Sequence, residues 1–105
     1  MKRGDIWWAR MALPAGRRPV VLISRDDAYR VRQRVTIAEL TTRVRGLVTE
    51  VWLRPSDGVP RASVINADNI VTISKSQLET KIVSLSAEKL AELDRALMFA
   101  LDLDG

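Results

Sequence analysis

The chain contains no cysteine and no histidine among its 105 residues. Without cysteine it has neither a disulfide framework nor a thiolate metal site. Without histidine it lacks the usual zinc ligand and the usual general base, so proton transfer must use a carboxylate, arginine, lysine, tyrosine or hydroxyl. A glycine-rich phosphate loop is also missing, which argues against nucleotide hydrolysis of the P-loop type. The acids Asp26 and Asp27 could bind magnesium, but adjacent acids after a strand are more often turn and cap residues.

Long apolar runs are also lacking. No run approaches the roughly 20 residues that a membrane-spanning helix needs, and the first apolar run is short and ends at Arg10. We therefore expect no signal peptide, no membrane contact and a cytoplasmic protein. Hydrophobic residues make up 47% of the sequence, which is too many for a disordered chain. The length predicts one domain, residues 1–105.

Positive charge is concentrated away from the C-terminal end. The chain has 17 basic and 13 acidic residues, a net charge of +4, yet its last twenty residues hold two basic and five acidic side chains. Residues 1–85 therefore carry a net charge of +7. Such a field favours a polyanion such as nucleic acid as partner, and the alternative is a solvated basic surface.

Short strands precede a single helix in the predicted order of elements. Apolar segments bounded by turn residues predict strands at residues 5–9, 18–24, 35–41, 49–53, 62–66, 71–74 and 81–85. We expect 49–53 to pair with 35–41, and we expect both faces of 18–24 to be covered. Ser86 suits the N-cap of a helix over 87–101, whose apolar stripe comprises Leu90, Leu93, Leu97 and Leu101. This pattern predicts a compact β-barrel with a helix packed against it.

Arg18 and Thr41 are the first candidate site residues. Arg18 precedes Pro19, whose ring disfavours the helical region for its neighbour and so holds Arg18 extended. A guanidinium fixed in this way can bind a phosphate through two parallel hydrogen bonds. Thr41 ends the strand predicted at 35–41, and its hydroxyl could stand beside that arginine. The alternative is a surface arginine and an unrelated strand-end threonine.

The three tryptophans allow two interpretations each. Trp7 and Trp8 should point to opposite faces of one strand, with one in the core and the other at a dimer interface. Trp52 alternates with apolar neighbours and is a candidate for an exposed position. An exposed tryptophan could stack on a base, although interface or core packing is the more common role.

Five segments, in this order, resemble the MazF/PemK family over nearly the whole chain. They are RGDIWW (3–8), GRRPVVLIS (16–24), LTTR (40–43), SVINADNI (63–70) and KIVSLS (81–86) leading into LAELDRAL (90–97). The resemblance implies a toxin of a bacterial toxin–antitoxin pair with a small SH3-like β-barrel fold. It further implies a homodimer that cleaves single-stranded RNA by attack of the 2′-hydroxyl, without metal or cofactor, and a cognate antitoxin that blocks the RNA groove with an acidic tail.

The resemblance also assigns roles to individual positions. Arg18 would stabilise charge on the scissile phosphate, and Thr41 would hydrogen-bond it. Asp68 aligns with an acid that some members use as general base, while Asn66 stands where some members carry a catalytic arginine. Further RNA contacts are expected from Arg17, Arg43, Asn66 and Asn69.

Glu39 departs from the family pattern in a strand that is often apolar there. It lies two residues before Thr41, so both side chains should share one face of the strand. Glu39 is therefore a second candidate for acid or base, and the alternative is a rim carboxylate paired with an arginine. We expect Asp68 to be the base, because its position matches the family.

Two other function classes remain open at this point. The same fold occurs in toxins that bind a protein target such as DNA gyrase, and a barrel of this kind could also bind nucleic acid without cleaving it. The pair of Arg18 and Thr41 favours the ribonuclease, because a gyrase binder has no need of a site that grips phosphate.

Overall fold

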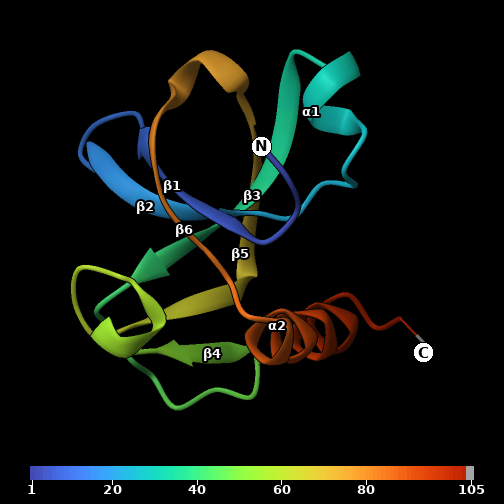
Figure 1. Ribbon diagram of the computed structural model, residues 1–105. Coiled ribbons are helices and arrows are strands. Elements are labelled where there is room, and N and C mark those ends of the chain that lie inside the picture. Colours follow the sequence, from blue (N-terminus) through green and yellow to red (C-terminus); the bar gives the residue numbers. More distant parts are fainter. Residues whose placement is uncertain (104–105) are drawn as a thin grey trace.

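The computed structural model describes residues 1–103 as a curved antiparallel sheet followed by a helix (Figure 1). The sheet has six strands in the spatial order β4-β5-β3-β2-β1-β6. Their bounds are β1 Asp5–Arg10, β2 Arg17–Leu22, β3 Arg34–Thr41, β4 Glu50–Leu53, β5 Ser63–Ser74 and β6 Leu78–Ser84. Strands β4 and β6 form the two edges, so the sheet is a half-barrel, and α2 (Ala87–Ala100) packs against β4 and β5. The predicted fold class, mainly β with a C-terminal helix, is confirmed.

Both faces of β2 are covered, as its continuous apolar sequence predicts. Val20, Val21 and Leu22 are fully buried, and Val21 belongs to a different apolar cluster from its two neighbours. One cluster lies against α2 and includes Leu93 and Leu97. The other includes Tyr29 of the short helix α1 (Ala28–Val31). The central strands are therefore held from two sides, which fixes the positions of the side chains at their ends.

The C-terminal helix follows its predicted pattern closely. The Ser86 side chain accepts a hydrogen bond from the Lys89 backbone N–H (3.2 Å), as an N-cap does. Within the apolar stripe, Leu93 and Leu97 are buried, and Leu90 packs against the same cluster. Leu101 lies just beyond the helix and is half exposed. Within residues 1–103, no helix is long and apolar enough to cross a membrane.

Two predictions about the strands were wrong, one about pairing and one about bounds. Strand β4 pairs with β5, through partners such as Val51 and Ile65, and not with β3. The segments 62–66 and 71–74 are also not separate strands, because β5 runs unbroken from Ser63 to Ser74. The reason is one of position: β5 lies between β3 and β4, so its first half has a partner on each side.

Strand β5 leaves the regular ladder with β3 at one point. Ala38 pairs with Ile70 and Leu40 pairs with Ile65, so four residues of β5, 66–69, face the single residue Glu39. An excess of residues on one strand bends that strand and redirects its side chains. This bulge brings polar residues of β5 beside the C-terminal end of β3.

Gly58 is the C-cap of the short 3-10 helix η1 (Pro55–Asp57), in the connection between β4 and β5. Its φ is 101°, and a Cβ at this position would lie 2.7 Å from Cγ2 of Val83 in β6. Glycine is thus required both by the left-handed backbone and by the close approach of β6. The next residue, Val59, is buried in the cluster beneath α2.

We predict that Gly58→Ala lowers the free energy of unfolding by more than the strained backbone alone requires, which is about 1–3 kcal/mol. The matched control is Gly46→Ala, because Gly46 also has a positive φ (74°) but a Cβ there meets nothing within 4 Å. Urea unfolding of both variants measures the difference. If Gly58→Ala and Gly46→Ala destabilise the protein equally, the close approach of Val83 does not contribute to the effect of Gly58→Ala.

Candidate active site

A small cavity of about 120 Å³ lies at the bulge between β3 and β5. Six of the eight predicted site residues line it, together with the unpredicted Arg45. The full set is Arg18, Glu39, Thr41, Arg43, Arg45, Asn66 and Asn69. A larger groove of about 750 Å³ shares Arg18, Thr41 and Arg43 with this cavity. The larger groove is also lined by Trp8, Arg17 and residues 59–61.

Arg18 faces both hollows from β2. Its Nε donates a hydrogen bond to the carbonyl oxygen of Ala15 (3.4 Å), which ties the guanidinium to the turn before the strand. Within residues 1–103, no carboxylate forms an ion pair with Arg18, Arg43 or Arg45. Three arginines thus meet the single carboxylate of Glu39 in the small cavity. This balance of charge suits an anion.

The Thr41 hydroxyl is oriented by the chain that follows it. The backbone N–H of Arg43 donates a hydrogen bond to Thr41 Oγ1 (3.1 Å). Because the oxygen accepts this bond, the hydroxyl hydrogen is available to a further acceptor. Thr41 can therefore donate to a phosphate oxygen held by Arg18.

Glu39 lies in the small cavity with Thr41, so the prediction that the two share one face of β3 is confirmed. Asn69 Nδ2 donates a hydrogen bond to Glu39 Oε2 (2.9 Å) across the bulge. This contact orients the carboxylate and leaves Oε1 without a hydrogen-bond partner among the described residues. The alternative expectation, that Glu39 pairs with an arginine, finds no ion pair in residues 1–103.

Asp68 is not brought together with Arg18 and Thr41. It lines neither the small cavity nor the groove, and its Oδ2 accepts a hydrogen bond of 2.6 Å from the Thr49 hydroxyl. Its neighbours Asn66 and Asn69 do line the cavity, because the bulge breaks the simple alternation of faces along β5. On geometry, Glu39 replaces Asp68 as the first candidate for a base.

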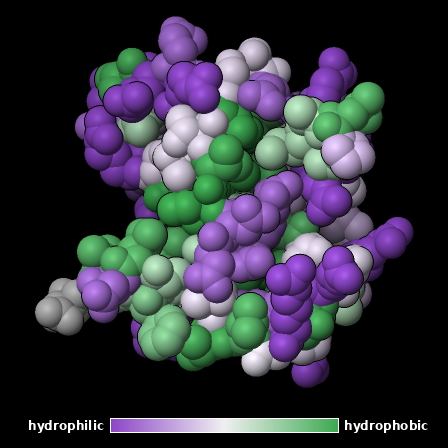
Figure 2. Space-filling model, turned by 180° about the vertical axis from the view of Figure 1, so that it is seen from behind, coloured by the Kyte–Doolittle hydropathy of each residue, from purple (hydrophilic) through white to green (hydrophobic). Residues whose placement is uncertain are grey.

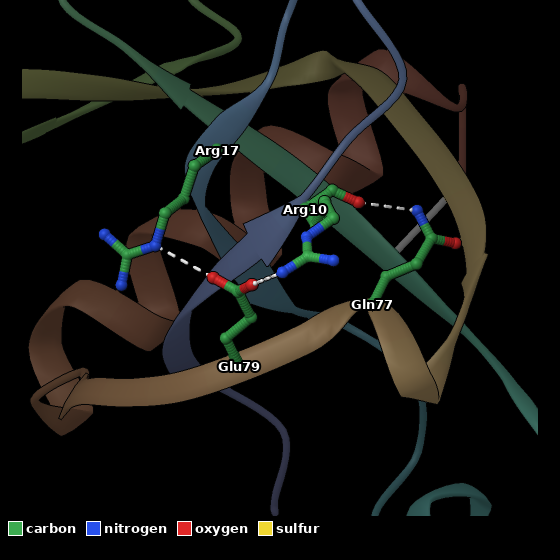
Figure 3. Close-up of polar contacts among 4 residues, drawn as sticks. All are labelled: Arg10, Arg17, Gln77 and Glu79. Carbon is green, nitrogen blue, oxygen red and sulfur yellow. Dashed lines mark hydrogen bonds and ion pairs between the residues drawn. The ribbon is translucent and has the colours of Figure 1, made fainter.

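Arg17 is held differently from Arg18. Its Nε donates to Glu79 Oε1 (2.8 Å), and Arg10 donates to the other oxygen of the same carboxylate (2.8 Å), as Figure 3 shows. Gln77 adds a hydrogen bond from its side-chain amide to the Arg10 carbonyl oxygen (2.8 Å). The hydrogen bond from Arg17 is the main reason that the pKa of Glu79 lies below its usual value. The charge of Arg17 is thus already paired.

Trp8 lies against the Arg17 guanidinium, and the expectation that one of the two adjacent tryptophans lies at a dimer interface stays a prediction. The Arg17 guanidinium carbon is 4.3 Å from the centre of the Trp8 ring, and both residues line the groove. Trp7 packs against the cluster that contains Tyr29. Trp8, the neighbour of the core residue Trp7, therefore borders the candidate site. Trp52 is half exposed, as expected.

Glu50 organises the loop 42–49, a role that sequence reasoning missed. Its carboxylate accepts hydrogen bonds from the backbone N–H groups of Arg45 (3.0 Å) and Leu47 (2.9 Å). The bond from Leu47 is the main reason that the pKa of Glu50 lies below its usual value. Arg43 and Arg45 are presented to the small cavity from this loop.

A metal site is not evident in the part of the chain that the structure describes. Residues 1–103 contain no group of three or more acidic side chains placed to hold an ion, and the sequence has no histidine or cysteine to add.

Comparison with known proteins gives one consistent result. Residues 2–101 match the family model for the PemK-like, MazF-like toxin of type II toxin–antitoxin systems. The chain belongs to the PemK/MazF toxin family. It is 41% identical over 101 residues to "Probable endoribonuclease MazF5" of Mycobacterium tuberculosis, covering 95% of this chain and 92% of that protein.

Solved structures of the PemK/MazF family agree with this assignment. The structure of the Mycobacterium tuberculosis toxin MazF-mt6 is 35% identical and superposes with a TM-score of 0.88, covering 96% of this chain and 99% of that one. The structure of a mycobacterial endoribonuclease in complex with its cognate antitoxin is 28% identical and superposes with a TM-score of 0.89. The match covers 100% of this chain and 98% of that chain.

We predict that Glu50→Gln loosens the loop 42–49. Because the folded pKa of Glu50 is lowered, its stabilising effect is present above the pKa of an unfolded glutamate and is lost as the pH falls through the folded value. The amide resonances of Arg45 and Leu47 should therefore shift together on acidification in the wild type but not in Glu50→Gln. A variant with unchanged amide shifts at neutral pH would contradict this role.

Proposed function

We propose that this protein is a sequence-specific endoribonuclease toxin that cleaves single-stranded RNA without a metal ion. The observation that supports this most is the meeting of Arg18, Thr41 and Glu39 in one cavity. These side chains are a cation for phosphate, a hydroxyl donor and a carboxylate base, which together suffice for transfer of a phosphoryl group within RNA. The names of the relatives support the same activity.

The proposed reaction uses the RNA's own ribose as nucleophile. Glu39 removes the proton from the 2′-hydroxyl, and the 2′-oxygen attacks the adjacent phosphorus. The bond from phosphorus to the 5′-oxygen breaks, which leaves a 2′,3′-cyclic phosphate and a 5′-hydroxyl whose proton comes from water. Arg18 and Thr41 stabilise the charge that gathers on the phosphoryl oxygens. Asn69 holds Glu39 in place.

The two alternative functions explain less of the structure. A toxin that binds a protein target, and a barrel that binds nucleic acid without cleavage, need no carboxylate beside a phosphate site. The hydrogen bond from Asn69 orients Glu39 within a mainly cationic cavity. This arrangement favours catalysis.

The decisive test is cleavage of single-stranded RNA by purified protein in EDTA. We predict products with 5′-hydroxyl ends, and a loss of about a hundredfold or more in rate for Arg18→Ala, as is typical when one preorganised donor is removed. Arg18→Lys should recover only part of this, because a point charge cannot replace a planar fork. Cleavage that requires magnesium, or ends that carry a 5′-phosphate, would contradict the proposal.

A second experiment separates the two candidate bases. We predict that Glu39→Gln slows single-turnover cleavage strongly while RNA binding changes little, and that the matched variant Asp68→Asn cleaves nearly as fast as wild type. Asp68 serves as control because its carboxylate is engaged by Thr49 outside the cavity. The reverse pattern would return the role to Asp68.

We further propose a cytoplasmic homodimer that is neutralised by an antitoxin with an acidic segment. The free arginines of the small cavity match such a segment as well as they match RNA. Apolar side chains gather beside the C-terminal end of α2 (Figure 2), where Phe99, Leu101 and Leu103 are each about half or more exposed. Exposed apolar surface of this kind favours association.

Light scattering at micromolar concentration should give the mass of a dimer. We expect Phe99→Asp to shift that mass toward the monomer, because a charge would be buried in the interface. A monomeric wild type would contradict the proposed dimer.

A further inference from the structure

We propose that the outer face of the Arg17 guanidinium is a stacking site for one nucleobase of the RNA, next to the phosphate site at Arg18. This inference rests on the proposed ribonuclease function and assigns a part of the groove that the reaction itself does not use. The ligand is a base that flanks the scissile phosphate.

The first argument is the fixed orientation of Arg17. Its guanidinium lies 4.3 Å above the Trp8 ring, so one face of the planar group is covered by an aromatic surface. The ion pair of Nε with Glu79 (2.8 Å) fixes the group in that plane. About half of the Arg17 side chain is exposed, and we infer that the face of the guanidinium away from Trp8 is accessible to a ligand.

The second argument is that Arg17 is poorly suited to a phosphate. Arg17 and Arg10 share the single carboxylate of Glu79, and the negative charge of that carboxylate would repel a phosphate brought beside it (Figure 3). A nucleobase is uncharged and gains from stacking on a guanidinium plane. Stacking of an uncharged base therefore fits this position better than a phosphate contact, and it specifies the RNA contact expected for Arg17 from sequence.

The third argument is the place of Arg17 in the groove. Arg17 and Arg18 are consecutive residues of β2, and both line the same groove of about 750 Å³. Single-stranded RNA is recognised mainly by bases that are splayed out and stacked on aromatic or arginine side chains. A chain whose phosphate is held at Arg18 can place a neighbouring base over Arg17.

The test uses an oligoribonucleotide of about ten nucleotides around a cleavage site mapped by end sequencing of a digested transcript. A 2′-deoxy sugar at that site prevents cleavage, and each flanking base is replaced in turn by an abasic unit. The variant is Arg17→Lys, which keeps the charge beside Glu79 but loses the planar face. The matched control is Arg10→Lys, because Arg10 shares Glu79 but lies outside the groove.

We expect Arg17→Lys to weaken binding about tenfold or more, the usual scale for one stacked base. The same loss should follow one abasic replacement in wild type, and the two changes together should add little. Arg10→Lys should bind like wild type, and Arg17→Lys should leave the salt dependence of binding unchanged.

Arg17→Lys binding at the wild-type level, or a loss of equal size on every abasic oligonucleotide, would overturn the stacking site. Failure of the wild type to cleave any RNA would instead overturn the proposed function, so the two failures are distinguishable. Glu79 is expected to act on binding only by positioning Arg17. Glu79→Gln should therefore weaken binding of the intact oligonucleotide, but not of the abasic oligonucleotide on which Arg17→Lys has no further effect. An effect that persists there would show a merely structural role for Glu79.

Discussion

The candidate site depends on the bulge at which four residues of β5 face Glu39 of β3. In a regular ladder one residue would face Glu39, and the side chains of β5 would alternate strictly between the two faces. The extra residues instead bring both Asn66 and Asn69 to the cavity, and Asn69 binds the Glu39 carboxylate. The packing on both sides of the central strands holds this irregularity in place.

Five arginines at and beside the candidate site divide into two groups with different chemistry. Arg18, Arg43 and Arg45 surround the small cavity, and no carboxylate pairs with them in residues 1–103. Arg10 and Arg17 share the carboxylate of Glu79. Net charge therefore describes the surface poorly, because the charge available to an anion is set by which arginines lack an acidic partner.

Local sequence was sufficient for much of the fold. The apolar run of β2, the Ser86 cap and the leucine stripe of α2 each depend on near neighbours, and each was predicted. The partner of β4 was not, because strand order depends on contacts far apart in the chain. Helix α1 was missed because four residues are too few to show helical periodicity.

The candidate site shows the same division between local and distant contacts. Arg18 and Thr41 follow from a proline and a strand end, and the shared face of Glu39 and Thr41 follows from the period of a strand. The expectation for Asp68 came from family likeness alone, and the bulge directs its carboxylate to Thr49. The pairing of Trp8, Arg17 and Glu79 joins β1, β2 and β6, which no local pattern indicates.

The central claim is that RNA binds with its scissile phosphate at Arg18, Thr41 and Glu39. The most direct measurement is an NMR titration of the protein with the uncleavable 2′-deoxy oligonucleotide, following backbone amides and arginine side chains. The account predicts the largest shifts at Arg18, Thr41, Glu39 and Asn69, and small shifts at Thr49 and along α2. Largest shifts at α2 or at Thr49, with the cavity unperturbed, would contradict it.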